Sequence, residues 1–393
     1  MTRLLVVFGT RPEVIKLAPV INELRARAAR GEDVDVTVCS TGQHQELLTG
    51  ALDAFDLEPD IDLSVMRENQ GLCGLLGRLL QGLEPVLKEV QPDIVVAQGD
   101  TTTTMAAGLA GFCHGTRFAH VEAGLRTHDK RQPFPEELNR RVAGVVADYN
   151  FVPTAGAAEA LEREAYASNS IFLTGNTVVD ATQWARQRAS ELVLPPELDP
   201  GDAPLMLVTA HRRENFGEAF RDMCFGIREV AESFPELRVI YPVHLNPNVR
   251  QPVQEILGPC KRISLVEPLD YVTFLALMNR SRLILTDSGG VQEEAPTLGK
   301  PVLVMRNKTE RPEAVLAGNV RLVGTDRLNI VEAATELLSD ATAWEAMAQV
   351  RSVYGDGLAS QRIAEVLLTG RMETPAFQAW STSEARVPAS TVG

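Results

Sequence analysis

Three side chains able to exchange protons each follow directly after a short apolar run with the composition of a β-strand: Asp100, Glu122 and His211. Convergent ionisable groups shielded from water have shifted, coupled titrations, which general acid–base catalysis uses. Taken singly, each has a plainer interpretation: Asp100 as a helix cap, Glu122 in a surface ion pair and His211 as a hydrogen-bonded structural residue. Arg11 and Lys16, in and just after the first such turn, could add positive charge. The combination favours a catalytic site.

A glycine-bearing turn offers a place for an anion. Asp287 and Ser288 follow another apolar run, and Gly289 and Gly290 then open a helical pattern. Glycines at a helix start let backbone N–H groups approach an anion, and the helix dipole adds favourable partial charge. An Asp/Ser cap before a flexible turn would give the same pattern. The motif alone therefore leaves phosphate binding and simple capping open.

Several common cofactor signatures are missing from the sequence. The first predicted strand is not followed by G-x-G-x-x-G, and the chain contains no H-E-x-x-H, no Cys/His cluster and no P-loop. These are the usual signatures of dinucleotide, zinc and ATP sites. We therefore expect a reaction that uses no cofactor and no metal.

The elements that must position these residues alternate in type along the chain. Short β-rich runs separated by longer helical patterns are typical of a parallel sheet covered on both faces. Ligands of such sheets bind beyond the carboxyl ends of the strands, where the candidate residues lie. The expected strands are Leu4–Phe8, Val34–Cys39, Ile94–Ala97, Arg117–Val121, Tyr149–Val152, Leu205–Thr209, Arg238–Val243, Ile263–Val266, Leu283–Thr286, Pro301–Val304 and Val320–Val323.

The length of 393 residues indicates more than one domain. We expect an α/β protein of two Rossmann-like domains facing across a cleft, with the first over residues 1–175 and the second over 176–355. The Pro/Asp/Gly-rich stretch Pro195–Pro204 has the composition of a linker. Residues 372–393 are rich in Thr, Ser, Pro and Ala without periodicity, which predicts a disordered tail.

Composition excludes several classes of partner. The net charge of −14 argues against a broad basic face for nucleic acid or anionic lipid. No stretch approaches the roughly 20 apolar residues of a membrane span, and the apolar N-terminal run is too short for a signal peptide. The 5 cysteines are scattered, without C-x-x-C spacing, which fits a reducing compartment. We expect a cytoplasmic protein that binds neither nucleic acid nor membrane.

Several longer motifs are spread along the chain. They are FGTRPEVIKLAP (8–19), TGQH (41–44), GDTTTT (99–104), HVEAGLRT (120–127), PEELNR (135–140), TGNTVVDA (174–181), HRREN (211–215), PVHLNPNV (242–249), TDSGGVQEEAPTLGKPVLVMR (286–306) and TERPEA (309–314). Strings of this length are specific. Together they resemble the non-hydrolysing bacterial UDP-N-acetylglucosamine 2-epimerases, in register over about residues 4–370.

The resemblance implies a fold similar to the glycosyltransferase-B type. The second domain would hold most of the nucleotide, and a C-terminal helix at about residues 356–371 would cross back to complete the first. The implied activity interconverts UDP-N-acetylglucosamine and UDP-N-acetylmannosamine without metal or nicotinamide. The resemblance also implies a homodimer.

The resemblance also implies roles for individual residues. Its acid/base positions match Asp100, Glu122, Glu136 and His211. Its substrate contacts match Arg11, Ser288, Gly289, Gly290, Glu294 and Arg311, with Phe274 near the uracil and Lys16 near the sugar. Related enzymes bind a second substrate molecule as an activator, through positions that match Gln43, His44, Arg212 and His244. Glu46 and Asn69 stand where strongly regulated members carry Gln and Arg, so we expect weak cooperativity.

The implied chemistry explains why such residues are needed. The C2 hydrogen of the sugar is not adjacent to a carbonyl and is too weakly acidic for direct removal by a carboxylate. Loss of UDP from C1 gives that carbon oxocarbenium character, and deprotonation at C2 then yields a 2-acetamidoglucal. Re-addition of UDP with protonation on the opposite face inverts C2. This route needs acid/base groups on two faces and a firm anion site; the sequence leaves open which carboxylate serves which face.

Three rival functions stay open at this level. A hydrolysing 2-epimerase would release UDP and free N-acetylmannosamine. A glycosyltransferase of the same architecture would explain the phosphate site but not the cluster of acids. A catalytically inactive sugar-nucleotide sensor would bind without turnover, although all four acid/base positions are retained.

Overall fold

The computed structural model describes residues 1–42, 45–65, 67, 71–309 and 311–379, and it divides into two compact units. The first unit comprises Met1–Ala185 and Tyr354–Gln378. Its sheet has seven parallel strands in the order β3-β2-β1-β4-β5-β6-β7. The strands are β1 (Thr2–Phe8), β2 (Val34–Ser40), β3 (Ile61–Asp62), β4 (Ile94–Gln98), β5 (Arg117–Val121), β6 (Tyr149–Val152) and β7 (Ile171–Leu173).

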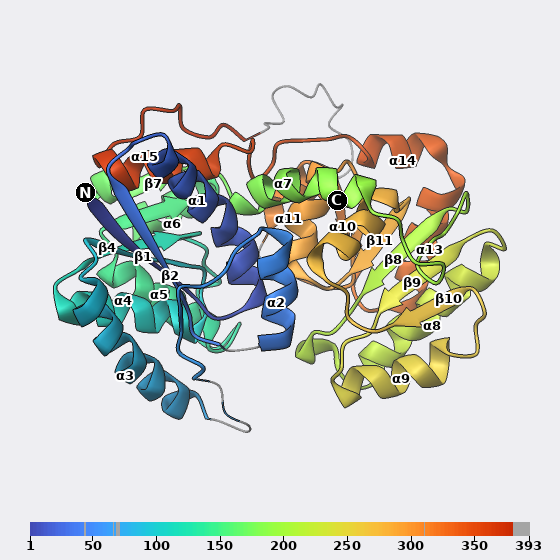
Figure 1. Cartoon of the computed structure of the whole chain (residues 1–393). Coiled ribbons are helices and arrows are strands. Elements are labelled where there is room, and N and C mark those ends of the chain that lie inside the picture. Colours follow the sequence, from blue (N-terminus) through green and yellow to red (C-terminus); the bar gives the residue numbers. More distant parts are fainter. Residues whose placement is uncertain (43–44, 66, 68–70, 310, 380–393) are drawn as a thin grey trace. The chain divides into compact units, whose positions relative to one another are not determined.

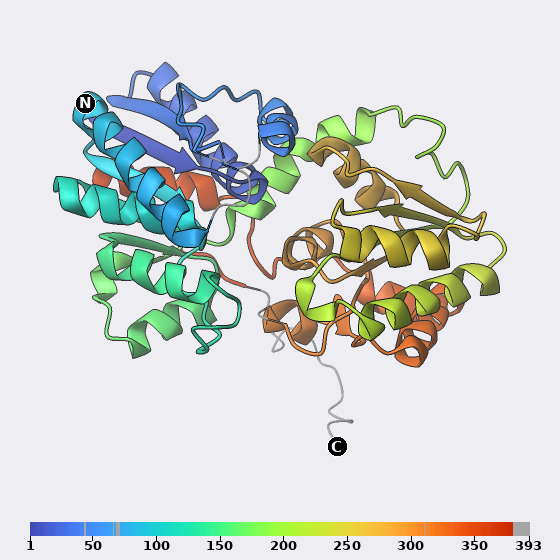
Figure 2. The same cartoon turned by 90° about the horizontal axis from the view of Figure 1, so that it is seen from below.

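Helices cover both faces of this sheet, as the alternating pattern predicts (Figure 1). One face carries α3 (Leu72–Val90), α4 (Thr102–His114) and α5 (Glu136–Val146), and their apolar side chains pack on β1, β4 and β5. Figure 2 shows α3 and α4 lying side by side on this face. The remaining helices of the unit are α1 (Arg11–Ala29), α2 (Gln45–Ala54), α6 (Ala155–Arg163) and α15 (Ala359–Thr369), of which α2 and α15 pack against α1.

Two edge strands have no counterpart among the strands expected from the sequence. β3 has two residues, and β7 has three half-buried ones. Such segments are too short to show an apolar run or alternation. All the other strands of this sheet coincide with predicted runs to within two residues.

The segment after α15 corrects the prediction that the disordered tail begins at residue 372. Phe377 is only 2% exposed, and its N–H donates to the carbonyl of Leu173 at 3.1 Å. The Glu365 carboxylate accepts hydrogen bonds from the N–H and hydroxyl of Thr374. One aromatic residue and a few polar contacts are enough to order this short segment, although it lacks periodicity. Residues 380–393 lie outside the described residues.

Truncation should separate these two parts of the tail. A chain ending after residue 379 should melt within about 2 °C of the full chain, whereas one ending after residue 371 should melt several degrees lower. Removing a buried Phe side chain forfeits about 3 kcal/mol, and 1 kcal/mol corresponds to roughly 2–4 °C in a unit of this size. Thermal unfolding of both chains by circular dichroism tests this. Equal melting temperatures would show that Phe377 contributes nothing.

The second unit comprises Arg186–Val353 and begins within α7 (Thr177–Glu191). The expected boundary at residues 175/176 therefore lies too early, because the first turns of α7 belong to the first unit: Asp180 of α7 accepts hydrogen bonds from Ser360. The second sheet is parallel, in the order β10-β9-β8-β11-β12-β13. Its strands are β8 (Leu205–Thr209), β9 (Arg238–Pro242), β10 (Ile263–Val266), β11 (Leu283–Thr286), β12 (Val302–Val304) and β13 (Val320–Leu322).

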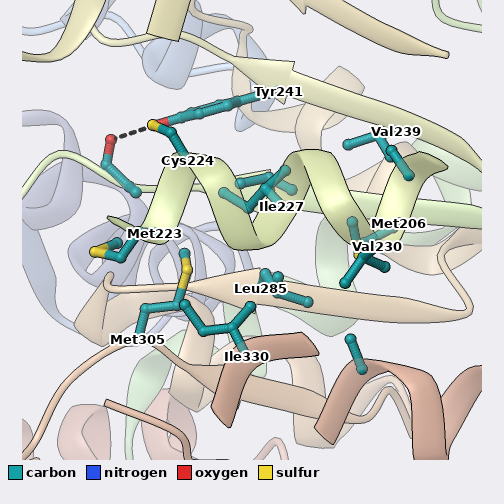
Figure 3. Packing of buried hydrophobic residues seen from close by; sticks show 14 of the residues in the cluster. Met206, Met223, Cys224, Ile227, Val230, Val239, Tyr241, Leu285, Met305 and Ile330 are labelled. Carbon is teal, nitrogen blue, oxygen red and sulfur yellow. Dashed lines mark hydrogen bonds between the residues drawn. The ribbon is translucent and has the colours of Figure 1, made fainter. Parts of the chain in front are cut away.

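The core of the second unit lies between this sheet and α8. Figure 3 shows Met223, Ile227 and Val230 of α8 packed among side chains from the strands and from Ile330 of α13. The helices of this unit are α8 (Glu218–Ser233), α9 (Pro247–Leu257), α10 (Tyr271–Arg280), α11 (Gly289–Thr297), α12 (Pro312–Leu316), α13 (Arg327–Ser339) and α14 (Ala341–Met347). Over the described residues, none of the helices combines the length and apolarity needed to span a membrane.

Candidate functional site

The ends of three neighbouring strands bring the candidate residues of the first unit to one edge of its sheet. β1, β4 and β5 are adjacent and parallel, so their carboxyl ends and the turns that follow lie together. Arg11 is the first residue of α1, after β1. Asp100 lies between β4 and α4, and Glu122 follows β5.

The side chain of Glu122 is largely shielded from solvent and accepts hydrogen bonds from neighbouring side chains. Its carboxylate accepts hydrogen bonds from Lys16 Nζ at 2.5 Å and Gln98 Nε2 at 2.9 Å, and its side chain is 8% exposed. Its backbone is left-handed, with φ of 63°. A non-glycine residue in this region is uncommon, and such strain concentrates at functional sites. The structure therefore joins Lys16 and Glu122 directly and excludes the surface ion-pair interpretation of Glu122.

Asp100 does not cap α4, so that interpretation is wrong. The N-cap is Thr101, whose hydroxyl accepts the N–H of Thr104 at 3.1 Å. The Asp100 carboxylate instead pairs with the guanidinium of Arg140, and the Asp100 carbonyl accepts Asn139 Nδ2 at 2.9 Å. Since the helix start is stabilised without Asp100, its carboxylate serves another purpose.

Glu136 is the first residue of α5, where the helix dipole favours a negative charge. It precedes Asn139 and Arg140 by three and four positions, and side chains at this spacing share one face of a helix. Both of those residues contact Asp100. Three of the four proposed acid/base residues thus belong to the same edge of the first unit.

Glu13 is a residue that the sequence did not single out. Its carboxylate is 1% exposed and accepts hydrogen bonds from the N–H of Thr10 at 2.7 Å and the hydroxyl of Thr101 at 2.7 Å. It therefore ties the turn that carries Arg11 to the turn that carries Asp100. Burial raises the pKa of Glu13, while these hydrogen bonds act in the opposite direction. The spacing Thr10-x-x-Glu13 is that of a capping box, which was the available signal.

His120 is the second buried group that sequence reasoning missed. Its ring lies inside β5 with Nε2 2.6 Å from the carbonyl oxygen of Gly99, the residue before Asp100. Burial lowers the pKa of His120 to about 4, so the ring is neutral near pH 7 and Nε2 donates its hydrogen to Gly99. His120 thereby fixes the peptide that orients Asp100.

The lowered pKa of His120 predicts an acid-dependent loss of stability. The unfolded chain binds a proton at His120 below about pH 6.5, whereas the folded chain resists it until about pH 4. The stabilisation that the neutral His120 ring provides is thus fully present above pH 6.5. The free energy of unfolding then declines by about 3 kcal/mol as the pH falls to 4. Urea unfolding of the wild type and His120→Gln at pH 7 and pH 4 measures it. We expect the wild type to lose more stability over this interval than the variant; equal losses would contradict the buried neutral ring.

In the second unit, His211 follows β8 and its backbone is fixed by Asp287, which follows the adjacent strand β11. The Asp287 carboxylate accepts the N–H groups of His211 at 2.9 Å and Arg212 at 2.8 Å. The His211 ring is exposed and stacks on His244, with centroids 5.4 Å apart. Burial, and then the neighbouring His211, lower the pKa of His244. Two of the four residues expected to contact an activator, Arg212 and His244, therefore adjoin His211.

The turn after β11 has the features of an anion site. Within the described residues, the Ser288 side chain makes no capping hydrogen bond to α11. The Arg311 guanidinium lies against Gly289, where an added Cβ would come within 2.7 Å of Arg311 Nη1. Arg311 Nε donates to the buried carboxylate of Glu293 at 2.6 Å, which fixes the guanidinium beside the helix start. A positive side chain and a helix dipole together favour a phosphate over a simple cap.

Gly290, unlike Gly289, has room for an added methyl group. A Cβ on Gly290 meets no heavy atom of the described chain within 4 Å. Gly290→Ala should therefore stabilise α11 by about 0.5–1 kcal/mol, because alanine is the better helix former. If UDP occupies this position, the methyl group should still weaken UDP binding about tenfold or more, which is roughly 1.4 kcal/mol. Thermal melting and titration calorimetry with UDP test both effects; unchanged UDP affinity would place the diphosphate elsewhere.

The remaining expected contact residues are placed as follows. Phe274 lies half-buried in α10, and Glu294 is buried in α11. Gln43 and His44, the other two expected activator contacts, lie outside the described residues, as does Asn69.

Comparisons with known proteins identify related sequences and structures. The sequence profile of a family described as UDP-N-acetylglucosamine 2-epimerase matches residues 26–368. The chain is similar to the UDP-N-acetylglucosamine 2-epimerase of Escherichia coli K12, with 49% identity over 378 residues that span 94% of this chain and 99% of the relative.

Solved structures support the same grouping. The UDP-GlcNAc 2-epimerase from Neisseria meningitidis, solved bound to UDP-GlcNAc, is 43% identical with a TM-score of 0.88, over 93% of this chain and 100% of that one. The glycotransferase of kitacinnamycin, 14% identical with a TM-score of 0.61 over 93% of this chain and 98% of that one, shares the fold alone. The prediction of two Rossmann-like domains of the glycosyltransferase-B type is confirmed.

Proposed function

Because this chain belongs to the UDP-N-acetylglucosamine 2-epimerase family, we propose that it interconverts UDP-N-acetylglucosamine and UDP-N-acetylmannosamine reversibly, without hydrolysing either. The observation that carries the proposal is the group of ionisable side chains at one sheet edge of the first unit. There Glu122 contacts Lys16, and Asp100 contacts Arg140. A glycosyltransferase of the same fold would explain an anion site but not a cluster of carboxylates at one sheet edge.

The reaction proceeds by elimination and re-addition. The C1–O bond to UDP breaks and its electron pair leaves with UDP, while a carboxylate removes the C2 proton to give 2-acetamidoglucal. UDP then adds back to C1, and an acid delivers a proton to the opposite face of C2. Atoms and electrons balance without an oxidant. Two proton-exchanging groups are therefore needed, and Asp100 and Glu122 are the candidates.

The residues around each carboxylate suit a proton-exchange role. Lys16 and Gln98 orient the buried Glu122, and Arg140 and Asn139 orient Asp100. Side chains held in this way keep a fixed geometry toward a reacting carbon, which lowers the entropic part of the barrier. We assign Glu136 and His211 as further acid/base groups, in agreement with the sequence resemblance.

UDP must be retained while it is detached from the sugar. We assign this task to the start of α11, with Ser288, Gly289, Gly290 and the fixed guanidinium of Arg311, and to Arg11 at the start of α1. Developing negative charge on the leaving diphosphate is stabilised by preoriented N–H groups and cations. Glu294 and Phe274 are assigned to the nucleoside part.

Incubation of the pure protein with UDP-N-acetylglucosamine alone tests this function, with the products identified by ¹H and ³¹P NMR. We expect a stable mixture of both UDP-sugars. Accumulation of free UDP with N-acetylmannosamine would establish a hydrolysing enzyme instead. Saturable UDP binding without any product would establish a sensor.

We further propose that the active form is a homodimer. Phe112 of α4 and Val145 of α5 are 65% and 77% exposed on the face formed by α3, α4 and α5. Exposed apolar side chains on neighbouring helices are typical of a surface that pairs with another chain. Sedimentation of the wild type and of Phe112→Glu/Val145→Glu tests this; a monomeric wild type would refute it.

A reducing, cytoplasmic setting fits the cysteines. All five are free, and Cys73 and Cys113 are exposed. Exposed thiols persist where glutathione keeps them reduced.

We propose that substrate activation through Arg212 and His244 is weak, because Glu46 and Asn69 stand where strongly regulated members carry Gln and Arg.

A further inference from the structure

The order in which strands are added to the second sheet reverses between β8 and β11. The two turns of this unit that carry candidate residues follow these two strands. From β8 the chain adds β9 and β10 on one side, and it then returns to place β11 on the other side of β8. At such a switch point the turns after two adjacent strands diverge and leave room for a ligand. His211 follows β8, and Ser288 lies in the turn after β11. Whatever links these turns controls how a proposed acid/base group stands relative to a proposed anion site.

Asp287 forms that link. Its side chain is fully buried, with 0% exposure. The carboxylate accepts the N–H of His211 at 2.9 Å, the N–H of Arg212 at 2.8 Å and Nδ2 of Asn215 at 3.3 Å. The Asp287 carbonyl also accepts Arg212 Nε at 3.2 Å, and its N–H donates to the Thr209 carbonyl at 3.0 Å. A residue of one turn is thus bound through side chain and main chain to the other turn.

The surroundings leave this link little freedom. Tyr241 of β9 donates its hydroxyl hydrogen to the carbonyl of Ala210 at 2.7 Å, which fixes the residue before His211 from a third strand. The Ser288 N–H donates to Thr286 Oγ1 at 2.9 Å, which fixes the residue after Asp287. Because Ala210 and Ser288 are both fixed, a change at Asp287 should displace the backbone of His211 and Arg212.

We propose that Asp287 is a positioning residue that couples the His211 imidazole to the anion-binding turn at Ser288–Gly290. This inference rests on the proposed function, in which His211 takes part in proton exchange and the turn holds UDP. Asp287 acts through the backbone of its neighbours. Binding of a diphosphate at the start of α11 is thereby transmitted to the His211 ring.

The chemistry of the three donors explains why the residue is an acid. A carboxylate offers only acceptors, whereas an asparagine amide carries two donors. One oxygen, Oδ2, accepts all three donors, and the other, Oδ1, lies 3.1 Å from the His211 N–H. In Asp287→Asn, an amide that keeps its oxygen at the Oδ2 position brings its NH₂ group against that N–H, donor against donor. The buried amide donor then has no acceptor there, so the turn at His211 should shift although the side chain keeps its shape.

Asp287→Asn should therefore lower kcat more than it weakens binding. A displacement of a catalytic group by about 1 Å costs on the order of 10²-fold in rate. We expect kcat to fall by about this factor and the dissociation constant of UDP to change only a few-fold, at a temperature where the variant is fully folded. The matched control is Asp180→Asn, because Asp180 is another buried carboxylate that accepts a backbone N–H and a side-chain donor, both from Ser360. The control should melt lower but keep its kcat.

A second readout does not depend on turnover. In protein labelled with [¹³C]histidine, the His211 ring signal can be assigned by comparison with His211→Gln, since the chain has only 6 histidines. We expect saturating UDP to shift this signal in the wild type and Asp180→Asn, and the shift to be lost in Asp287→Asn. If the wild type does not epimerise UDP-N-acetylglucosamine, the proposed function is wrong. The UDP-induced shift of the His211 signal still tests whether Asp287 couples His211 to the turn at Ser288–Gly290. A wild-type kcat together with an unchanged UDP-induced shift in Asp287→Asn would overturn the inference.

Discussion

Replacing Glu122 by glutamine should lower kcat for epimerisation by about 10²–10⁴-fold, the usual contribution of one general acid–base group. This corresponds to roughly 3–5 kcal/mol of activation barrier. Glutamine has nearly the same shape and can still accept one hydrogen bond from Lys16 or Gln98, but it cannot exchange a proton with C2. The affinity for UDP should change much less. Initial rates from a coupled assay and UDP titration measure the two quantities.

The buried Lys16 complicates this experiment, because Glu122→Gln removes the carboxylate that its ammonium contacts. Rates must therefore be compared below the melting temperature of the variant. Glu164→Gln provides the matched control, since Glu164 pairs with Arg126 in the same unit at 2.9 Å and has no proposed role in catalysis. The control should retain kcat within about twofold. Near-normal turnover of Glu122→Gln would assign Glu122 to structure alone.

Asp100→Asn should produce a loss of the same size, about 10²–10⁴-fold in kcat, with little change in melting temperature. The structure separates catalysis from capping at this position because Thr101 is the N-cap of α4. An asparagine can still accept a hydrogen bond from Arg140, so the local fold should persist. The comparison needs rates and melting curves on the same preparations.

Thr101→Ala shows what the loss of the cap itself would do. Removing a capping hydroxyl costs about 1 kcal/mol of stability, so this variant should melt lower than Asp100→Asn. If Asp100→Asn instead melted like Thr101→Ala while keeping its turnover, Asp100 would have a structural role only.

The sequence predicted the fold well because both sheets are parallel and buried. Strands covered on both faces are continuous apolar runs, and Leu4–Phe8 and Leu283–Thr286 are clear examples. Edge strands such as β3 and β7 were missed because they are short and half-buried. The ordered segment around Phe377 was missed because one buried aromatic residue gives no periodic signal.

The sequence alone singled out the proposed acid/base residues but not the residues that orient them. Positions after strands identified Asp100, Glu122 and His211, since a strand end is visible in the sequence. Glu13 was not singled out, and Asp287, although it also follows a strand, was considered only as part of a helix cap. Each contacts a turn distant in the chain, and an acid near a helix start has the same local pattern whether it caps that helix or links two turns. Only the order of strands in the sheet brings their partners together.

The most direct test of the account is turnover of UDP-N-acetylglucosamine in D₂O, followed by ¹H NMR of both epimers. Elimination and re-addition bring a proton from an exchanging group to C2, so the C2–H signals of UDP-N-acetylglucosamine and UDP-N-acetylmannosamine should both disappear as deuterium enters. The rate of deuterium incorporation should follow kcat in the Asp100→Asn and Glu122→Gln variants. Epimerised product that keeps its C2 hydrogen in D₂O would contradict the elimination mechanism and, with it, the roles assigned to both carboxylates.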